Sequence, residues 1–225
     1  MSDEHDHAEH EGHDHAEHES LGQAEHEGHD HGEHEHQHQH HEHRPLTYEE
    51  AIAGFRADKD AFFQTNPHSP VPADERETFT GLPYYAIDPD WRFEDLHLEP
   101  YRGDEPSDFQ IPTSDGQLRP AHRAGMLRFE RDGERSGLTA YTFDGGDERS
   151  LFVPFLDATS GRDTYGAGRY LDLEQEDDGT YSLDFNLAYH PSCAYDPRFS
   201  CPLTPPENRL PVRIEAGERL PPTTA

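Results

Sequence analysis

Short segments of alternating apolar and polar residues, separated by turn pairs, make up most of the chain past residue 78. Four Asp-Gly pairs separate these segments, at residues 115–116, 132–133, 144–145 and 178–179. Asp-Gly pairs are typical of tight hairpin turns, because both residues tolerate the positive φ angles that these turns require. We therefore predict a mainly β fold, an antiparallel sandwich or barrel, with strands at about 79–86, 91–98, 109–113, 125–131, 137–143, 150–155, 167–174, 180–188 and 211–215.

One helix is expected ahead of the strands. Thr47, with Glu50 three residues later, is typical of a capping box at a helix N-terminus. Apolar residues then follow at near-helical spacing through about residue 64, at Ile52, Phe55, Phe62 and Phe63. This spacing predicts an amphipathic helix packed on the sheet, and the sequence NPHSPVP at 66–72 is expected to end it.

Residues 1–43 have a different composition from the rest of the chain. They contain 14 acidic residues, 15 of the 19 histidines and neither lysine nor arginine. The sequence AEHEGHDH at 8–15 recurs at 24–31, and Leu21 is the only large aliphatic residue after Met1. Because so little apolar surface cannot offset the entropy of ordering, we predict a disordered tail over 1–44 and a single β-rich domain over 45–225.

The tail is also a candidate metal-binding segment. Neutral imidazole is a ligand for zinc, nickel and copper, and a flexible chain lets neighbouring rings converge on one ion. The candidate ligands are His13, His15, His29, His31, His34, His36, His38, His40, His41 and His43. We therefore predict binding or buffering of divalent Zn, Ni or Cu; the alternative is an acidic tail that adds only charge.

The formal net charge of −30 narrows the classes of partner. Nucleic acids and anionic lipid surfaces both require a basic face, so neither is expected. No apolar segment approaches the roughly 18 residues of a membrane span, and the acidic N-terminus does not resemble a secretory signal. We therefore expect a cytoplasmic protein whose partners are metal ions, with a small molecule as a further candidate partner.

Lys59 is the only lysine, and the other 17 basic residues are arginines. Many carboxylates with almost no lysine are what we expect of a protein that stays soluble in concentrated salt, where screening weakens the repulsion between like charges. We therefore predict a halophilic protein. A GC-rich genome combined with an acidic tail is the alternative explanation.

Several long motifs resemble the uncharacterised domain-of-unknown-function family 1684 of bacteria and archaea. They are FRADKDAFF at 55–63, HSP at 68–70, FTGLPYY at 79–85 and IEAGE at 214–218. The resemblance covers about 46–219 and excludes the histidine-rich tail. It implies no reaction, because the family has no assigned activity. His190 is a departure, since the family usually has asparagine at this position.

Outside the tail, the side chains that could carry chemistry are densest between 154 and 218. If the strands at 167–174 and 180–188 form a hairpin, Arg169 approaches Asp184 and Asn186. One interpretation is a hydrolase or isomerase with a small-molecule pocket, its candidate catalytic residues being Asp157, Arg169, Asp184 and Asn186. The other is a buried hydrogen-bond network that holds long loops to the sheet.

The two cysteines, Cys193 and Cys201, leave four interpretations open. They are a disulfide, ligands of a zinc site together with His190, ordinary buried thiols, or a catalytic thiol. The motifs of nucleotide-binding loops are missing from the sequence, so no nucleotide cofactor is predicted.

The halophilic interpretation predicts that the protein melts at a higher temperature in about 3 M KCl than in about 0.1 M KCl, because the Debye length falls from about 10 Å to below about 3 Å. Thermal unfolding in the two buffers measures the difference. An equal or lower melting temperature at high salt contradicts the interpretation.

Overall fold

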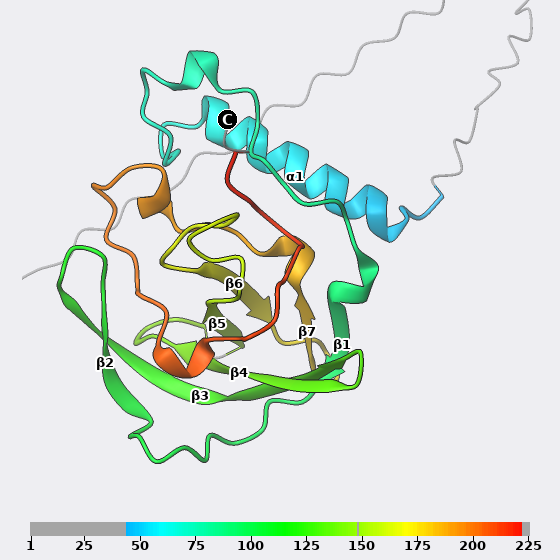
Figure 1. Cartoon of the computed structure of the whole chain (residues 1–225), viewed down its shortest axis with the longest axis vertical. Helices are drawn as coiled ribbons and strands as arrows, with labels where there is room; N and C mark the ends of the chain where they lie inside the picture. Colours follow the sequence, from blue (N-terminus) through cyan, green and yellow to red (C-terminus); the bar gives the residue numbers. More distant parts are fainter. Residues whose placement is uncertain (1–43, 148, 222–225) are drawn as a thin grey trace, which may run out of the picture. The chain divides into compact units, whose positions relative to one another are not determined.

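The computed structural model describes residues 44–147 and 149–221, which form one α-helix, seven β-strands and several short 3-10 turns (Figure 1). All strand pairs within the sheets are antiparallel. The prediction of a mainly β fold with one helix ahead of the strands is therefore confirmed. The predicted tail lies outside the described residues, apart from Arg44.

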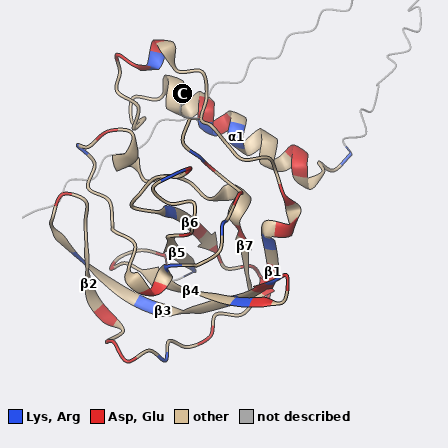
Figure 2. Ribbon diagram, viewed as in Figure 1, with Lys and Arg blue, Asp and Glu red and all other residues tan. Residues whose placement is uncertain are grey.

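The helix α1 (Tyr48–Thr65) begins with the predicted capping box, in which Thr47 and Glu50 each bond the other's backbone. Acidic and basic residues both lie along α1 (Figure 2). No helix in the described part of the chain is long and apolar enough to cross a membrane.

The predicted apolar face of α1 is only half right. Ile52 and Phe63 are buried, whereas Phe55 and Phe62 are 48% and 42% exposed. The buried face instead includes polar side chains three or four residues from the two buried apolar ones: Tyr48, Arg56 and Lys59. These side chains bond to groups on other elements, so polar contacts hold much of the helix in place.

Five consecutive strands form the larger sheet in the order β2-β3-β4-β5-β6. They are β2 (Asp108–Pro112), β3 (Leu118–Arg131), β4 (Glu134–Thr142), β5 (Ser150–Phe155) and β6 (Arg169–Glu174). The Asp-Gly pairs at 115–116, 132–133 and 144–145 join neighbouring strands, as predicted. The smaller sheet pairs β1 (Arg92–Leu96) with β7 (Tyr181–Asp184).

A bulge in β3 between Arg123 and Gly125 links the two sheets. Just after it, Met126 pairs with Glu99, which follows β1. A Cβ atom at Gly125 would lie 2.5 Å from the carbonyl oxygen of Glu99, so only glycine permits this approach. The bulge therefore brings the segment after β1 onto the larger sheet.

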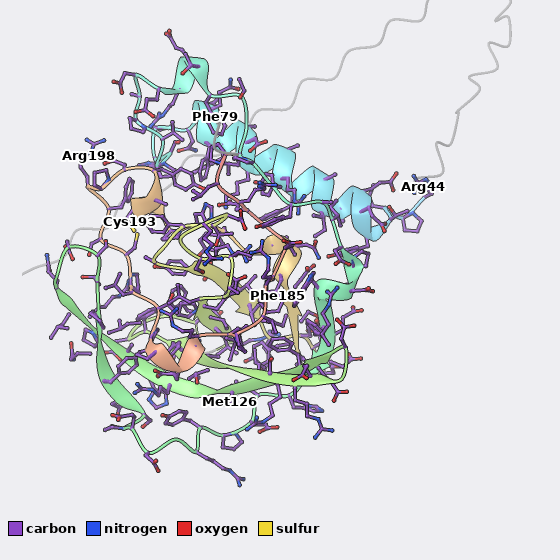
Figure 3. All side chains as sticks on the ribbon, viewed as in Figure 1. Arg44, Phe79, Met126, Phe185, Cys193 and Arg198 are labelled. Atoms are coloured by element: carbon purple, nitrogen blue, oxygen red, sulfur yellow. The ribbon has the colours of Figure 1, made fainter. Side chains whose placement is uncertain are left out.

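The main core lies between the two sheets. Alternate residues of β3 to β6 point into it, and their buried side chains are Leu127, Phe129, Leu138, Ala140, Leu151, Val153, Phe155, Leu171 and Leu173. Phe185, labelled in Figure 3, packs among them, with ring centroids 5.2 Å from Phe155, 5.4 Å from Phe129 and 5.6 Å from Trp91. Burial of these side chains from water drives the folding of this region.

Two predicted strands, 79–86 and 211–215, are wrong. In the first, Gly81 has a φ of 113°, the N–H of Leu82 bonds the Asp60 carboxylate of α1, and Pro83 has no N–H. In the second, the N–H of Ile214 bonds a side chain. Both segments therefore satisfy their backbone groups outside a sheet ladder.

The predicted hairpin of 167–174 with 180–188 is also wrong. β6 pairs with β5, and β7 pairs with β1. The Asp-Gly pair at 178–179 therefore joins two different sheets. The outer edge of β6 is partly covered, because Tyr170 and Tyr189 exchange backbone hydrogen bonds across it.

Candidate functional site

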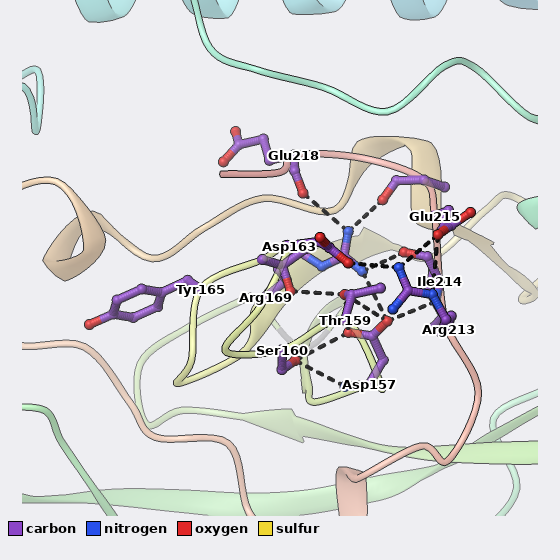
Figure 4. A network of polar contacts seen from close by, with 12 residues as sticks. Asp157, Thr159, Ser160, Asp163, Tyr165, Arg169, Arg213, Ile214, Glu215 and Glu218 are labelled. Atoms are coloured by element: carbon purple, nitrogen blue, oxygen red, sulfur yellow. Dashed lines mark hydrogen bonds and ion pairs between the residues drawn. The ribbon is translucent and has the colours of Figure 1, made fainter. Parts of the chain in front are cut away.

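Arg169, at the start of β6, is completely buried and points toward the C-terminal segment 211–221 (Figure 4). Its guanidinium donates to the backbone carbonyls of Ile214, Ala216 and Glu218. Its Nη2 lies 3.6 Å from Oδ2 of Asp157. Burial lowers the pKa of Arg169, while the nearby Asp157 opposes this shift. The side chain therefore neutralises a buried carboxylate and holds a segment that has no strand partner.

Asp157 is buried as well, and other groups of the protein already bond its carboxylate. It accepts hydrogen bonds from the hydroxyl of Thr159 at 2.7 Å, the hydroxyl of Ser160 at 3.1 Å and the backbone N–H of Ile214 at 2.7 Å. These contacts correspond to the second interpretation of the sequence, a buried network that holds loops together.

The other two candidate catalytic residues belong to a second network. Asp184 accepts from the hydroxyl of Tyr48 at 2.8 Å and from the backbone N–H of Asn186 at 2.9 Å. The Asn186 amide exchanges hydrogen bonds with the backbone of Asp88. No hydrogen bond or ion pair among the described residues joins Arg169 to Asp184 or Asn186, so the predicted four-residue site is not assembled.

Glu218 is a buried acid that the sequence analysis missed. Its carboxylate lies 2.5 Å from Nζ of Lys59 and accepts hydrogen bonds, each of 2.7 Å, from the backbone N–H of His190 and the hydroxyl of Tyr195. Three separate parts of the chain therefore meet at one carboxylate, which is 1% exposed. The only available signal in the sequence was that Lys59 is the single lysine.

His190 lies beside this carboxylate, with Nδ1 3.8 Å from Oε2 of Glu218. Its Nε2 accepts a hydrogen bond from the backbone N–H of Tyr165 at 3.2 Å. Burial, helped by the positive charges of Arg169 and Lys59, lowers the pKa of His190 to about 3. The imidazole is therefore neutral at neutral pH.

Both cysteines are free thiols. The backbone N–H of Cys193, labelled in Figure 3, donates to Sγ of Cys201 at 3.2 Å, and burial raises the pKa of Cys201 to about 11. A raised pKa keeps this thiol protonated and a poor nucleophile. Within 44–147 and 149–221, no three His, Cys, Asp or Glu side chains form a group that could hold a metal, so the His190–Cys193–Cys201 site is not formed.

A cavity of about 640 Å³ lies next to the Glu218 cluster. Its lining comes from the loop 71–83, the segment 190–195 and residues 219–221. Most of the lining is apolar, and the side chains with polar groups include His190, Tyr195, Arg219 and Glu75. A concave apolar site with a few polar groups is the usual form of a small-molecule site.

The Arg169 network predicts a large loss of stability for Arg169→Met, about 3–5 kcal/mol in the free energy of unfolding, because a buried carboxylate loses its partner. Denaturant unfolding measures the loss. Arg213→Met is the matched control, since Arg213 also pairs with acids, Asp163 and Glu215, but is 44% exposed; its exposed pairs contribute little. A folded Arg169→Met protein of unchanged stability contradicts the structural role.

The buried neutral His190 predicts a pH-dependent stability. Its folded pKa of about 3 lies below the ordinary 6.5, so only the unfolded chain takes up this proton as pH falls through that window. Stability is therefore fully present above about pH 6.5 and lost toward pH 3, by up to about 1.4 kcal/mol per pH unit. His190→Asn removes this part of the slope. Parallel stability curves for the two proteins, measured in urea at several pH values, contradict the prediction.

Comparison with known proteins places the chain in a family. The family model described as a protein of unknown function (DUF1684) matches residues 77–219, a span that begins after α1. The solution NMR structure of an uncharacterized protein from Haloarcula marismortui is 39% identical, with a TM-score of 0.59 over 77% of this chain and 95% of that one. None of the curated proteins matches the chain. The chain therefore belongs to the DUF1684 family of proteins of unknown function.

Proposed function

We propose that this protein binds and buffers divalent transition metals through its histidine-rich tail. The observation that carries the proposal is the density of ligands, with 15 histidines and 14 carboxylates within residues 1–43. Imidazole binds zinc, nickel and copper, and the carboxylates complete the coordination shell and neutralise the charge of the ion. Zn, Ni and Cu are accordingly the metals that we expect.

The repeated sequence favours many similar sites over one specific site. The segments His13–x–His15 and His29–x–His31 occupy equivalent positions in the repeat, and the histidines from 34 to 43 are closer still. Because no rigid cage is implied, affinity at each site is moderate and capacity is high. Ligands must be deprotonated to bind, so metal is released as the pH falls below about 6.5.

The domain would then act as the folded carrier of the tail in a salt-rich cytoplasm. Residues 44–225 contain 34 acidic and 18 basic residues, a net charge of −16 that does not depend on the tail. At molar salt this charge is screened and keeps the protein soluble without loosening the fold.

A hydrolase or isomerase acting through Asp157, Arg169 and Asp184 has less support. The carboxylate of Asp157 and both terminal nitrogens of Arg169 are already bonded within the protein, and Asp184 belongs to a separate network. A catalytic group needs a polar atom free to reach the substrate.

The metal proposal is tested on the full-length protein by zinc titration calorimetry at about pH 7.5, where imidazole is neutral. We expect several zinc ions per chain. Replacing the ten candidate histidines between His13 and His43 with glutamine removes most of this capacity, because the amide is a far weaker ligand than imidazole.

The matched control replaces the four histidines outside the tail, which are His68, His97, His122 and His190. This variant keeps the full zinc capacity. The proposal fails if the tail variant binds as much zinc as the unmodified protein, or if the unmodified protein binds none.

A further inference from the structure

Arg219 lines a cavity and has no acidic partner among the residues that the structure describes. It lines the cavity of about 640 Å³, and no carboxylate among the described residues forms an ion pair with it. Its Nε is buried and has no hydrogen-bond partner. The guanidinium carbon lies 5.1 Å from the ring centroid of Tyr85, which supports one side of the group. A guanidinium that lines a cavity and pairs with no acid among the described residues favours an added acceptor at its terminal nitrogens.

The backbone on both sides of Arg219 is fixed in place. Its own N–H donates to the carbonyl of Pro83 at 2.9 Å, and the N–H of Leu220 donates to the carbonyl of Asp163 at 2.7 Å. The preceding residue, Glu218, is held by Lys59 and by its hydrogen bonds. The guanidinium is therefore attached to a rigid position, which lowers the entropic cost of binding a ligand.

The walls of the cavity suit an apolar body. They include Val71, Phe79, Leu82 and Leu220, of which Val71 and Leu82 are 6% and 9% exposed. Phe79 and Leu220 are partly exposed, so a ligand that covers them gains the free energy of removing their apolar surface from water, about 25 cal/mol per Å².

The remaining polar groups limit the charge of the ligand. The hydroxyl of Tyr195 is uncharged and already donates to Glu218. Nε2 of His190 accepts a hydrogen bond from the backbone N–H of Tyr165, so it carries no proton and the imidazole adds no positive charge. Among the described residues of the lining, Arg219 is the only cation and the exposed Glu75 is the only acid. One carboxylate matches one guanidinium, whose donor pair fits a carboxylate as a fork. A second negative charge is disfavoured by the net charge of −30.

We propose that this cavity binds a small organic monocarboxylate, with its carboxylate on Arg219 and its apolar body against Val71, Phe79 and Leu82. The site is separate from the tail and does not depend on metal binding.

The test uses hexanoate and phenylacetate as probes, titrated into the full-length protein in the salt buffer that gives the highest melting temperature. Calorimetry or NMR chemical-shift changes report binding. We expect saturable binding of both acids, and much weaker binding of hexanamide and hexanol, which keep the apolar body and lack the charge.

Arg219→Gln removes the guanidinium and is expected to weaken hexanoate binding by about 10- to 100-fold, the usual effect of losing a charge-assisted hydrogen-bond pair. Arg198→Gln is the matched control. Arg198 follows the segment 190–195, pairs with Asp196, and its side chain is 81% exposed (Figure 3). This variant binds hexanoate as the unmodified protein does.

A second variant tests the cavity independently of charge. Ala194 is part of the lining, and Ala194→Phe fills space that the apolar body would occupy. Binding of both acids is then lost while the melting temperature shows that the protein is folded. The proposal is overturned if neither acid binds, if hexanol binds as tightly as hexanoate, or if folded Arg219→Gln binds hexanoate with unchanged affinity.

Discussion

The structure depends on a C-terminal segment that lies among buried groups without joining a sheet. Buried backbone N–H and C=O groups must be hydrogen-bonded. Side chains therefore supply the donors and acceptors that a neighbouring strand would otherwise provide. Arg169 donates hydrogen bonds to three backbone carbonyls of this segment, and Asp157 accepts one from the backbone N–H of Ile214. Glu218 then joins the segment to α1 through Lys59 and to the loop that contains His190 and Tyr195. Removal of any one of these charges leaves another buried without a partner.

The same constraint explains why a lysine, and not an arginine, occupies position 59. The ammonium of Lys59 contacts Glu218 while lying 4.6 Å from the ring centroid of Tyr189 and 5.4 Å from that of Phe63. A compact point charge interacts with an acid and two aromatic faces at once, whereas a guanidinium is larger, planar and suited to a fork. Elsewhere in the chain, where arginine faces solvent or pairs with exposed acids, no such restriction applies. The contacts of Lys59 therefore explain why this one position keeps a lysine. They do not explain why lysine is scarce in the rest of the chain.

The acidic character of the chain divides into two parts with different physical consequences. Residues 1–43 of the tail have 14 acidic residues and no lysine or arginine, hence −14, and residues 44–225 have 34 acidic and 18 basic residues, hence −16. The first part lies among candidate metal ligands, where bound cations would neutralise it. The second belongs to a folded domain whose most buried acids, such as Glu218 and Asp157, already have cationic partners. Arg219 is different, because it lines a cavity and no acid in the described part of the chain pairs with it.

The sequence by itself determined the features that depend on neighbouring residues. Asp-Gly pairs specify turns locally, so β2, β4, β5 and β6 were predicted closely, and the Thr47–Glu50 box specified the start of α1. Of β3, only the second half was predicted, because the polar residues from 118 to 124 give no apolar alternation. Asp157 and Arg169 were also among the four candidate catalytic residues, but only the tertiary structure brought these two together as a buried support. Glu218, the cavity and the exposure of Phe55 remained unpredicted, because burial and ion pairing depend on contacts between distant segments. The segments 79–86 and 211–215 have strand-like composition, yet no local pattern specifies the partners of their backbone groups. The partners of the first lie on α1 and at residues 217–219, and those of the second lie on β6 and in the loop after β5.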